Sequence, residues 1–324
     1  MTAMRLGLLS TANINRQILA GAARTGRVEV VAVGSRDGAH AQAYASEHGI
    51  PKAHGSYEAL LDDPEVDAVY VSLPNGMHHE WAMRALAAGK HVLCEKPYTR
   101  HPAEAAEAYD AAEAARLILM EAFMYRHHPQ TKTIERLVSE GAVGRVRSVL
   151  AVFSFPLDDL TNVRAIPELD GGALMDVGCY CVSGSRIVAG EPRSVLAEQV
   201  VGETGVDMAL YGTLRFPNDV VGQIEASFQA PQRQYLGVVG DEGVLRAFAP
   251  WRVDWGGDLV LERDGSSQVV PVEEANAYTQ ELENLADAVQ GHGYPLLGRA
   301  DAVQQARVID ALYRAAGERS AVVL

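Results

Sequence analysis

The stretch His91-Val92-Leu93-Cys94-Glu95-Lys96-Pro97 places an apolar run directly before a lysine and a proline. Such a run is typical of a buried parallel strand, and the lysine stands at its carboxyl end, where open α/β sheets bind their ligands. Proline fixes its own φ and restricts the residue before it, so Lys96 is presented from a stiff bend. The Lys96–Pro97 bond can also be cis, a geometry usually kept for tight turns. The alternative is a solvated loop.

Strand and helix patterns alternate through the first third of the chain. Apolar runs at residues 4–10, 28–35, 66–72 and 117–120 join the run at 91–94, and helical spacing of apolar residues occupies 14–24, 40–48, 78–88 and 102–115. Continuous apolar runs suit strands that helices cover on both faces. Repeated strand–helix units require right-handed crossovers and a parallel sheet. We therefore predict an α/β fold whose first domain, residues 1–121, is a doubly wound Rossmann sheet.

The pattern changes after residue 121. A helix near 129–140 precedes a long strand at 145–155, and Asp170-Gly171-Gly172 opens a helix that runs to about residue 188. Strand-like runs separated by turn signals fill 194–272, and helices at 278–290 and 299–316 follow. We predict a second, α+β domain at 122–324 with a large, mostly antiparallel open sheet. One face of such a sheet needs cover, which favours a homo-oligomer, a dimer or tetramer, formed through it.

Bulk properties exclude several partners. The 324 residues are enough for two domains, and 42 acidic against 28 basic residues give a net charge of −14. That charge disfavours nucleic acid, whose phosphates need a basic face. No apolar stretch is long enough to span a bilayer. Three cysteines are too few for a disulfide framework and lack zinc-ligand spacing. We expect a cytoplasmic protein with neither nucleic-acid nor membrane partners.

The first loop stands where a dinucleotide-binding protein carries Gly-x-Gly-x-x-Gly. Here the residues are Ser10-Thr11-Ala12-Asn13-Ile14-Asn15, without glycine at the three key positions. Small residues still allow close backbone approach, and a helix that begins near Asn13 directs free amides and its positive dipole end at a pyrophosphate. We predict that residues 10–14 bind this group. The other interpretation is an N-capped helix after a strand.

The second strand ends in Gly34-Ser35-Arg36-Asp37. Enzymes that use NAD usually place an acidic residue here for the ribose 2′-hydroxyl. Ser35 and Arg36 instead offer a hydroxyl and a guanidinium, which suit the extra phosphate of NADP. NAD remains possible, because Asp37 turning inward could accept the ribose hydroxyl.

The third strand ends in Ser72-Leu73-Pro74-Asn75, with His78 at the start of the next helix. We place Ser72, Leu73, Asn75 and His78 in the cofactor site, where Asn75 and His78 can bond ribose or pyrophosphate; Asn75 as a helix cap is the alternative. No histidine and carboxylate set here has metal-ligand spacing, so we predict no metal. Polar clusters follow each strand in turn, and in this topology that edge must hold the crevice. The clusters are Ser10, Ser35-Arg36, residues 72–75, 95–97 and 121–126.

With these residues in view, the chain resembles the glucose–fructose oxidoreductase/inositol dehydrogenase (Gfo/Idh/MocA) family. The resemblance runs nearly end to end and rests on Glu95-Lys96-Pro97, residues 120–129 (MEAFMYRHHP) and residues 171–180 (GGALMDVGCY). It is nearest to the branch of D-xylose 1-dehydrogenases, dimeric dihydrodiol dehydrogenases and sugar ketoreductases, in which a tyrosine commonly stands where Tyr180 does. The nucleotide loop departs from the family in its missing glycines.

The resemblance implies that Lys96 and Tyr180 are the catalytic pair. Hydride transfer at a carbinol carbon requires a proton to leave or reach the substrate oxygen. The pKa values of free lysine and tyrosine are about 10.4 and 10, and a neighbouring ammonium lowers the pKa of a phenol. We expect Tyr180 to exchange the proton while Lys96 polarises the oxygen. Asp176, four residues earlier on the same helix face, would hold a substrate hydroxyl or orient the pair.

Other residues are placed around this pair. We expect Tyr125 and Arg126 to border the substrate cleft; the alternative for Arg126 is an exposed arginine at an interdomain joint. Glu95 and Arg164 are assigned to the cofactor site with Lys96.

Three functions remain open at this stage. The leading one is an NADP- or NAD-dependent oxidoreductase acting on a sugar or related polyol, with dehydrogenase and ketosugar reductase not distinguished. A second enzyme hypothesis is redox-assisted glycoside processing with tightly bound NAD. The third is a cofactor-sensing regulator without catalysis on the same fold.

Overall fold

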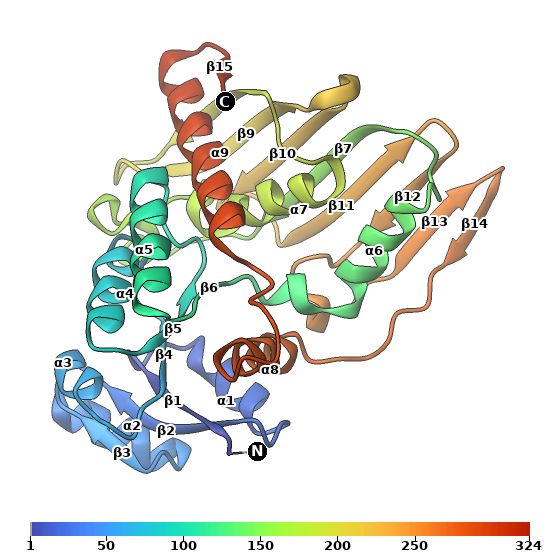
Figure 1. Cartoon of the computed structure of the whole chain (residues 1–324). Coiled ribbons are helices and arrows are strands. Elements are labelled where there is room, and N and C mark those ends of the chain that lie inside the picture. The colour runs from blue at the N-terminus through green and yellow to red at the C-terminus, as the bar shows by residue number, and fades with distance from the viewer. Residues whose placement is uncertain (1) are drawn as a thin grey trace. The chain divides into compact units, whose positions relative to one another are not determined.

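The computed structural model describes residues 2–324 and forms two sheets (Figure 1). The first sheet is parallel throughout, in the order β3-β2-β1-β4-β5-β6. This is the strand order of a Rossmann fold, with its reversal between β1 and β4. The predicted α/β fold class is confirmed. The strands are β1 (Met4–Leu8), β2 (Val28–Gly34), β3 (Lys52–His54), β4 (Ala68–Val71), β5 (His91–Glu95) and β6 (Leu119–Ala122).

Apart from α3, the helices of this sheet lie close to their predicted positions. They are α1 (Asn15–Ala22), α2 (Gly38–His48), α3 (Tyr57–Leu61), α4 (His78–Ala87) and α5 (Pro102–Ala115). Ser56 accepts the backbone N–H of Ala59 and thereby caps α3. We did not predict β3 and α3, because elements of three and five residues are too short to show a period.

The second sheet has nine strands in the order β14-β13-β12-β11-β7-β10-β9-β8-β15. Only β7 and β10 pair in parallel, and the other neighbours are antiparallel. The predicted, mostly antiparallel sheet is therefore confirmed. Its strands are β7 (Val146–Ser154), β8 (Ser194–Val201), β9 (Asp207–Arg215), β10 (Val221–Ser227), β11 (Arg233–Gly240), β12 (Gly243–Ala247), β13 (Leu259–Arg263), β14 (Ser266–Val269) and β15 (Val322–Val323).

Two helices bury one face of this second sheet. The helix predicted after Gly172 begins as a π-helical turn, η5 (Leu174–Gly178), and continues as α7 (Cys179–Ala189). A Cβ at Gly178 would lie 2.9 Å from Ala226 of β10, and one at Gly212 of β9 would lie 2.9 Å from Leu312 of α9 (Arg299–Glu318). Both helices therefore pack directly on the strands. The remaining helix here is α6 (Pro129–Ser139).

The chain packs as two compact units whose limits differ from the predicted domains. The first comprises the chain up to Thr99, Ala103–His127 and Ala275–Val303, and the second comprises Arg100–Pro102, His128–Glu274 and Gln304–Leu324. The division thus follows His127 instead of residue 121, and α8 (Ala277–Val289) returns to the first unit. The reason is packing on α1: Thr279 Oγ1 donates to the carbonyl of Gly21 at 3.0 Å.

Candidate functional site

A buried network of three polar side chains fastens the ends of β1 and β4 to α1. The hydroxyl oxygens of Ser10 and Ser72 lie 2.7 Å apart, and Ser72 Oγ donates to Asn15 Oδ1 at 2.7 Å. Asn15 Nδ2 donates in turn to the carbonyl of Ser10 at 2.8 Å. The hydroxyls of Ser10 and Ser72, both predicted cofactor ligands, therefore serve the loop itself. Asn15 has no exposed surface, and we had assigned it no role.

The N-terminus of α1 presents backbone donors. Within residues 2–324, the N–H groups of Thr11, Asn13 and Ile14 have no acceptor, whereas Ala12 N donates to Ser10 Oγ at 3.1 Å. The first turn of α1 contains no acidic residue. Free amides at the positive end of a helix dipole suit an anion. Residues 10–14 therefore fit a pyrophosphate, although the glycine fingerprint is missing.

Asp37 and Arg36 at the end of β2 have different surroundings. Asp37 Oδ1 accepts the backbone N–H groups of Ala39 and His40, at 2.8 and 3.0 Å, and so caps α2. Ser35 is buried, with its hydroxyl 3.3 Å from the N–H of Asp37. Arg36 is exposed beside this cap. The carboxylate is therefore engaged by the helix, and the guanidinium is the exposed cation at this strand end.

His78 joins two loops. The side chain has no exposed surface; its Nδ1 lies 2.9 Å from the carbonyl oxygen of Pro97 and its Nε2 lies 2.8 Å from that of Leu73. Burial lowers the pKa of the imidazole. The ring thereby ties the loop after β4, which contains Asn75, to the loop that follows Lys96. The bond of His78 to ribose or pyrophosphate stays a prediction.

Glu95 and Lys96 stand at the end of β5. Glu95 accepts a short hydrogen bond from the hydroxyl of Tyr70 and lies 3.3 Å from the backbone N–H of Lys96. Burial, followed by the charge of Glu95, raises the pKa of Tyr70 well above its usual value, so the phenol remains a donor. The Lys96–Pro97 peptide bond is cis. Tyr70 thus orients the carboxylate next to the predicted catalytic lysine.

Tyr125 and Arg126 lie in a short 3₁₀ turn, η2 (Met124–His127), just after β6. The ring of Tyr125 is buried and packs edge-on against Phe123, with ring centroids 6.0 Å apart. Arg126 Nη1 lies 3.4 Å from Asp301 Oδ1. Both predicted cleft residues therefore belong to the first unit, beyond the last strand of its sheet.

Asp176 and Arg164 are brought together in the second unit. Arg164 Nε donates to Asp176 Oδ2 at 2.7 Å, and Asn162 Oδ1 accepts the backbone N–H of Arg164 at 3.1 Å. Arg164, which we had assigned to the cofactor, therefore pairs with the predicted substrate ligand. Asp176 lies in the π-helical turn η5. Such turns occur often at functional sites.

Tyr180 lies in an aromatic cluster. Its ring centroid is 5.5 Å from that of Phe153 on β7 and 6.2 Å from that of Trp251. Trp251 is fixed in turn, because its indole N–H donates to the carbonyl of Val152 at 3.0 Å. Rings packed in this way restrict the direction in which the phenol points. Neither Phe153 nor Trp251 follows from the sequence, since both are distant from residue 180 along the chain.

The predicted catalytic residues are divided between the units. Lys96 belongs to the first and Tyr180 to the second. Their convergence on one substrate oxygen stays a prediction. In residues 2–324 no group of three or more histidine, cysteine, aspartate or glutamate side chains could hold a metal ion, and no helix there has the length and hydropathy to cross a membrane.

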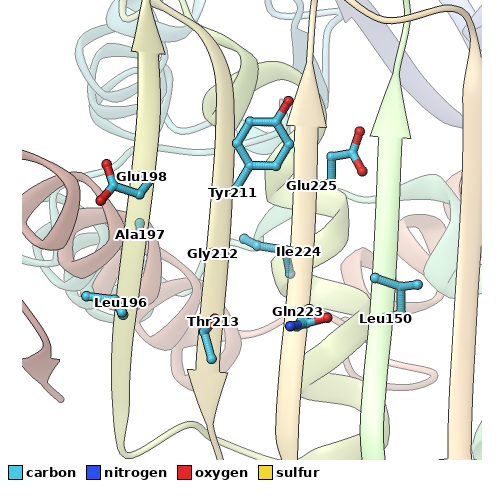
Figure 2. Close-up of a pocket in the computed structure, with 10 residues that line it drawn as sticks. All are labelled: Leu150, Leu196, Ala197, Glu198, Tyr211, Gly212, Thr213, Gln223, Ile224 and Glu225. Carbon is cyan, nitrogen blue, oxygen red and sulfur yellow. The ribbon is translucent and has the colours of Figure 1, made fainter.

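The open face of the second sheet carries a shallow hollow (Figure 2). One row of paired residues crosses β8, β9, β10 and β7 as Leu196, Thr213, Gln223 and Leu150. In the next row Tyr211 stands between Glu198 and Glu225. The first row is thus apolar on its two outer strands and polar on the two inner ones, and the second row places an aromatic ring between two carboxylates.

Comparison with known proteins places these features in a family. An oxidoreductase-family model with an NAD-binding Rossmann fold matches residues 5–123, and a GFO/IDH/MocA C-terminal domain model matches residues 131–246. D-xylose 1-dehydrogenase (NADP(+)) 2 of Haloferax volcanii is 41% identical over 325 residues, covering 99% of this chain and 100% of the relative. A trans-1,2-dihydrobenzene-1,2-diol dehydrogenase of Danio rerio is 38% identical over 250 residues, covering 75% and 74%.

Solved structures agree along nearly the whole chain. An aldose-aldose oxidoreductase from Caulobacter crescentus, complexed with glycerol, superposes with a TM-score of 0.93 at 27% identity, covering 99% of this chain and 100% of the other. KijD10, a 3-ketoreductase from Actinomadura kijaniata solved with NADP and TDP-benzene, gives a TM-score of 0.91 at 29% identity, covering 97% and 98%. With two family models matched in order and a full-length relative above 40% identity, the chain belongs to the Gfo/Idh/MocA family of oxidoreductases.

Proposed function

We propose that this chain is an NADP-dependent oxidoreductase that transfers a hydride between nicotinamide and a carbinol or carbonyl carbon of a sugar or related polyol. The observation that carries the proposal is the end-to-end identity of 41% to an NADP-dependent D-xylose dehydrogenase. A 3-ketoreductase matches 97% of the chain, and an enzyme of that name reduces a carbonyl carbon of the same kind. Sugar dehydrogenase and ketosugar reductase are therefore both compatible with this fold.

Two features of the first unit support NADP. The amides of Thr11, Asn13 and Ile14 would hold the pyrophosphate, as their free N–H groups suit an anion. Arg36 would meet the 2′-phosphate, while the Asp37 carboxylate is engaged in capping α2. Bound NADP would supply the hydride acceptor or, reduced, the hydride donor.

The residues of the chain would handle the proton. Tyr180 donates it to a carbonyl oxygen during reduction and removes it during oxidation, while the ammonium of Lys96 polarises that oxygen. Asp176, oriented by Arg164, would accept a hydrogen bond from a neighbouring substrate hydroxyl. Tyr125 and Arg126 would border the same substrate.

A substrate panel tests the proposal. The purified chain is mixed with aldoses, ketosugars and polyols and with NADP, NAD or their reduced forms, and the absorbance of the reduced nicotinamide is followed. We expect at least one sugar to be converted with a stoichiometric change in reduced nicotinamide. We also expect a preference for NADP over NAD. Substrate conversion without net nicotinamide change would favour glycoside processing with tightly held NAD. Cofactor binding without any turnover across the panel would favour a regulator.

We further propose that the chain forms a homo-oligomer through the open face of the second sheet and works in the cytoplasm. Leu150, Leu196 and Tyr211 on that face are 41–47% exposed. Apolar side chains gathered on a flat sheet are typical of an interaction surface, and a second copy offers a matching sheet. The three cysteines are free and buried, as in a reducing compartment.

A further inference from the structure

The Gly171-Gly172 pair allows a very close approach of other groups. Gly172 has φ +123°, and a Cβ there would lie 2.0 Å from Asp207 Oδ1. A Cβ at Gly171 would lie 2.5 Å from the carbonyl oxygen of Arg164. Any other residue at position 172 would be strained and would displace the carboxylate. Gly172 therefore leaves room for Asp207 at the start of the helix that bears Asp176 and Tyr180, and Gly171 leaves room for the backbone of Arg164.

Asp207 binds the first turn of that helix. The residue opens β9 and is only 4% exposed. Its Oδ2 accepts the backbone N–H of Leu174, the first residue of η5, at 2.7 Å. Its Oδ1 accepts the hydroxyl of Tyr313 from α9 at 2.9 Å. A carboxylate at a helix N-terminus satisfies a free amide and complements the dipole.

The helix α9 holds the same segment at a second point. Gln305 is buried, and its Nε2 donates to the carbonyl of Cys179, next to Tyr180, at 2.8 Å. The guanidinium of Arg186 donates to Gln305 Oε1 at 2.8 Å. Gln305 and Tyr313 are eight residues apart and so lie on one face of α9. Two side chains of α9 therefore brace the helix around Tyr180, one of them through Asp207.

We propose that the ionised carboxylate of Asp207, held by Tyr313, is a positioning group for Asp176 and Tyr180, and that turnover depends on its charge. This inference rests on the proposed function, in which Tyr180 exchanges a proton with the substrate. Asp207 acts through the helix, since its oxygens are engaged by Leu174 and Tyr313.

The surroundings of Asp207 raise the pKa of its carboxyl toward neutral pH. Burial raises the pKa of this carboxyl to about 6, against the opposing effect of its hydrogen bonds from Leu174 and Tyr313. The charged groups beyond Tyr313 are Arg100, whose guanidinium lies 5.5 Å from the centre of the Tyr313 ring, and Asp170, which pairs with Arg100 at 3.1 Å. Protonation below about pH 6 replaces one acceptor oxygen with a donor and weakens the clamp.

The same shift has a definite sign for stability. A carboxyl whose pKa is higher in the folded than in the unfolded state stabilises the fold below the unfolded value, and that contribution is lost as the pH rises through about 6. At pH 8 the buried charge therefore opposes folding. Asp207→Asn should therefore unfold no more easily than the wild type at pH 8.

The test compares Asp207→Asn, Tyr313→Phe and the control Asp241→Asn. Asp241 is also a carboxylate that accepts a backbone N–H, that of Arg145 at 2.7 Å, but in an exposed loop of the second unit. The kcat of carbonyl reduction by NADPH is measured from pH 5 to 8. In the wild type and in Asp241→Asn, kcat should fall as the pH is lowered, with a midpoint near pH 6.

Each variant has its own expected profile. Asp207→Asn should have about tenfold lower kcat at pH 8 and no midpoint, because a neutral acceptor binds an amide less strongly than a charged one. Tyr313→Phe should move the midpoint to higher pH, because it removes a donor that favours the ionised carboxylate. Hydrogen exchange at the Leu174 amide should be several-fold faster in Asp207→Asn than in Asp241→Asn.

Two results would overturn the inference: a wild-type kcat profile in Asp207→Asn, or unchanged exchange at Leu174. Failure of the proposed function looks different. If the proposed function is wrong, Tyr180→Phe should keep near-native turnover. Hydrogen exchange at the Leu174 amide does not depend on activity, so it tests the role of Asp207 separately.

Discussion

The residues next to Lys96 and Tyr180 are themselves ordered by hydrogen bonds and ring contacts. Tyr70 orients Glu95 beside Lys96, while Phe153 and Trp251 pack against the ring of Tyr180. A proton donor must meet the substrate oxygen in a narrow range of directions, and packed neighbours supply that order before the substrate binds.

Replacement of either residue should remove turnover and leave cofactor binding intact. Tyr180→Phe and Lys96→Met should each lower kcat by about 10²–10⁴-fold, the usual contribution of general acid–base catalysis. NADPH affinity, measured by fluorescence titration, should change little in Tyr180→Phe. The matched controls are Tyr294→Phe, beyond the end of α8, and Lys132→Met on α6, both exposed and expected to be neutral. Near-native turnover in either site variant would contradict the assignment.

Arg36 should decide between the two dinucleotides. Arg36→Ala should weaken NADPH binding by roughly 10–100-fold, because a charged hydrogen bond contributes about 1.5–3 kcal/mol, and should leave NADH binding unchanged. Titration of each reduced cofactor, with exposed Arg24→Ala as the control, measures the difference. An equal loss for both cofactors would place Arg36 away from the 2′-phosphate.

At the scale of elements, α8 returns to the first unit because α1 lets it approach closely. A Cβ at Gly21 would lie 3.0 Å from Tyr278 Cβ and 3.1 Å from the backbone nitrogen of Thr279. The contact is extended by Thr25, whose hydroxyl donates to Glu283 at 2.9 Å. A helix 255 or more residues away along the chain is thus part of the nucleotide-binding unit.

A side chain at Gly21 should separate the two helices. Gly21→Val should lower the free energy of unfolding by about 1–3 kcal/mol, as overpacking generally does, because backbone atoms of α8 cannot move aside cheaply. The control is Gly26→Val, where a Cβ meets nothing within 4 Å. Urea unfolding of both variants provides the comparison, and equal midpoints would show that α1 and α8 tolerate the extra volume.

At the scale of the whole molecule, one face of the second sheet is covered by α7 and α9, and the other bears the hollow between Leu150 and Leu196 (Figure 2). An uncovered sheet face with apolar side chains favours association.

A charge on this face should prevent association of two copies. Leu196→Glu should shift the chain to a smaller species in light scattering coupled to size exclusion, since a carboxylate buried without a partner is strongly unfavourable. Val269→Glu, on the exposed strand β14, is the control and should keep the wild-type mass. A wild-type mass for Leu196→Glu would exclude this face as the interface.

The local patterns of the sequence determined the elements and the class of fold. Apolar runs followed by helical spacing predicted the parallel sheet, and the turn signals after residue 194 predicted the antiparallel one, because period and turn chemistry act over a few residues. Glu95-Lys96-Pro97 and residues 171–180 likewise placed the candidate catalytic side chains on a strand end and a helix.

Tertiary structure alone decided which side chains serve which partner. Ser10 and Ser72 bond each other, His78 joins two backbone carbonyls, and Arg164 pairs with Asp176. Asp207 reaches the Gly171-Gly172 turn from a strand that begins more than thirty residues later. Such contacts arise when distant elements pack, and no short-range pattern of residue types records them. The order and type of elements are therefore legible in the chain, while the hydrogen bonds that position the site depend on the fold.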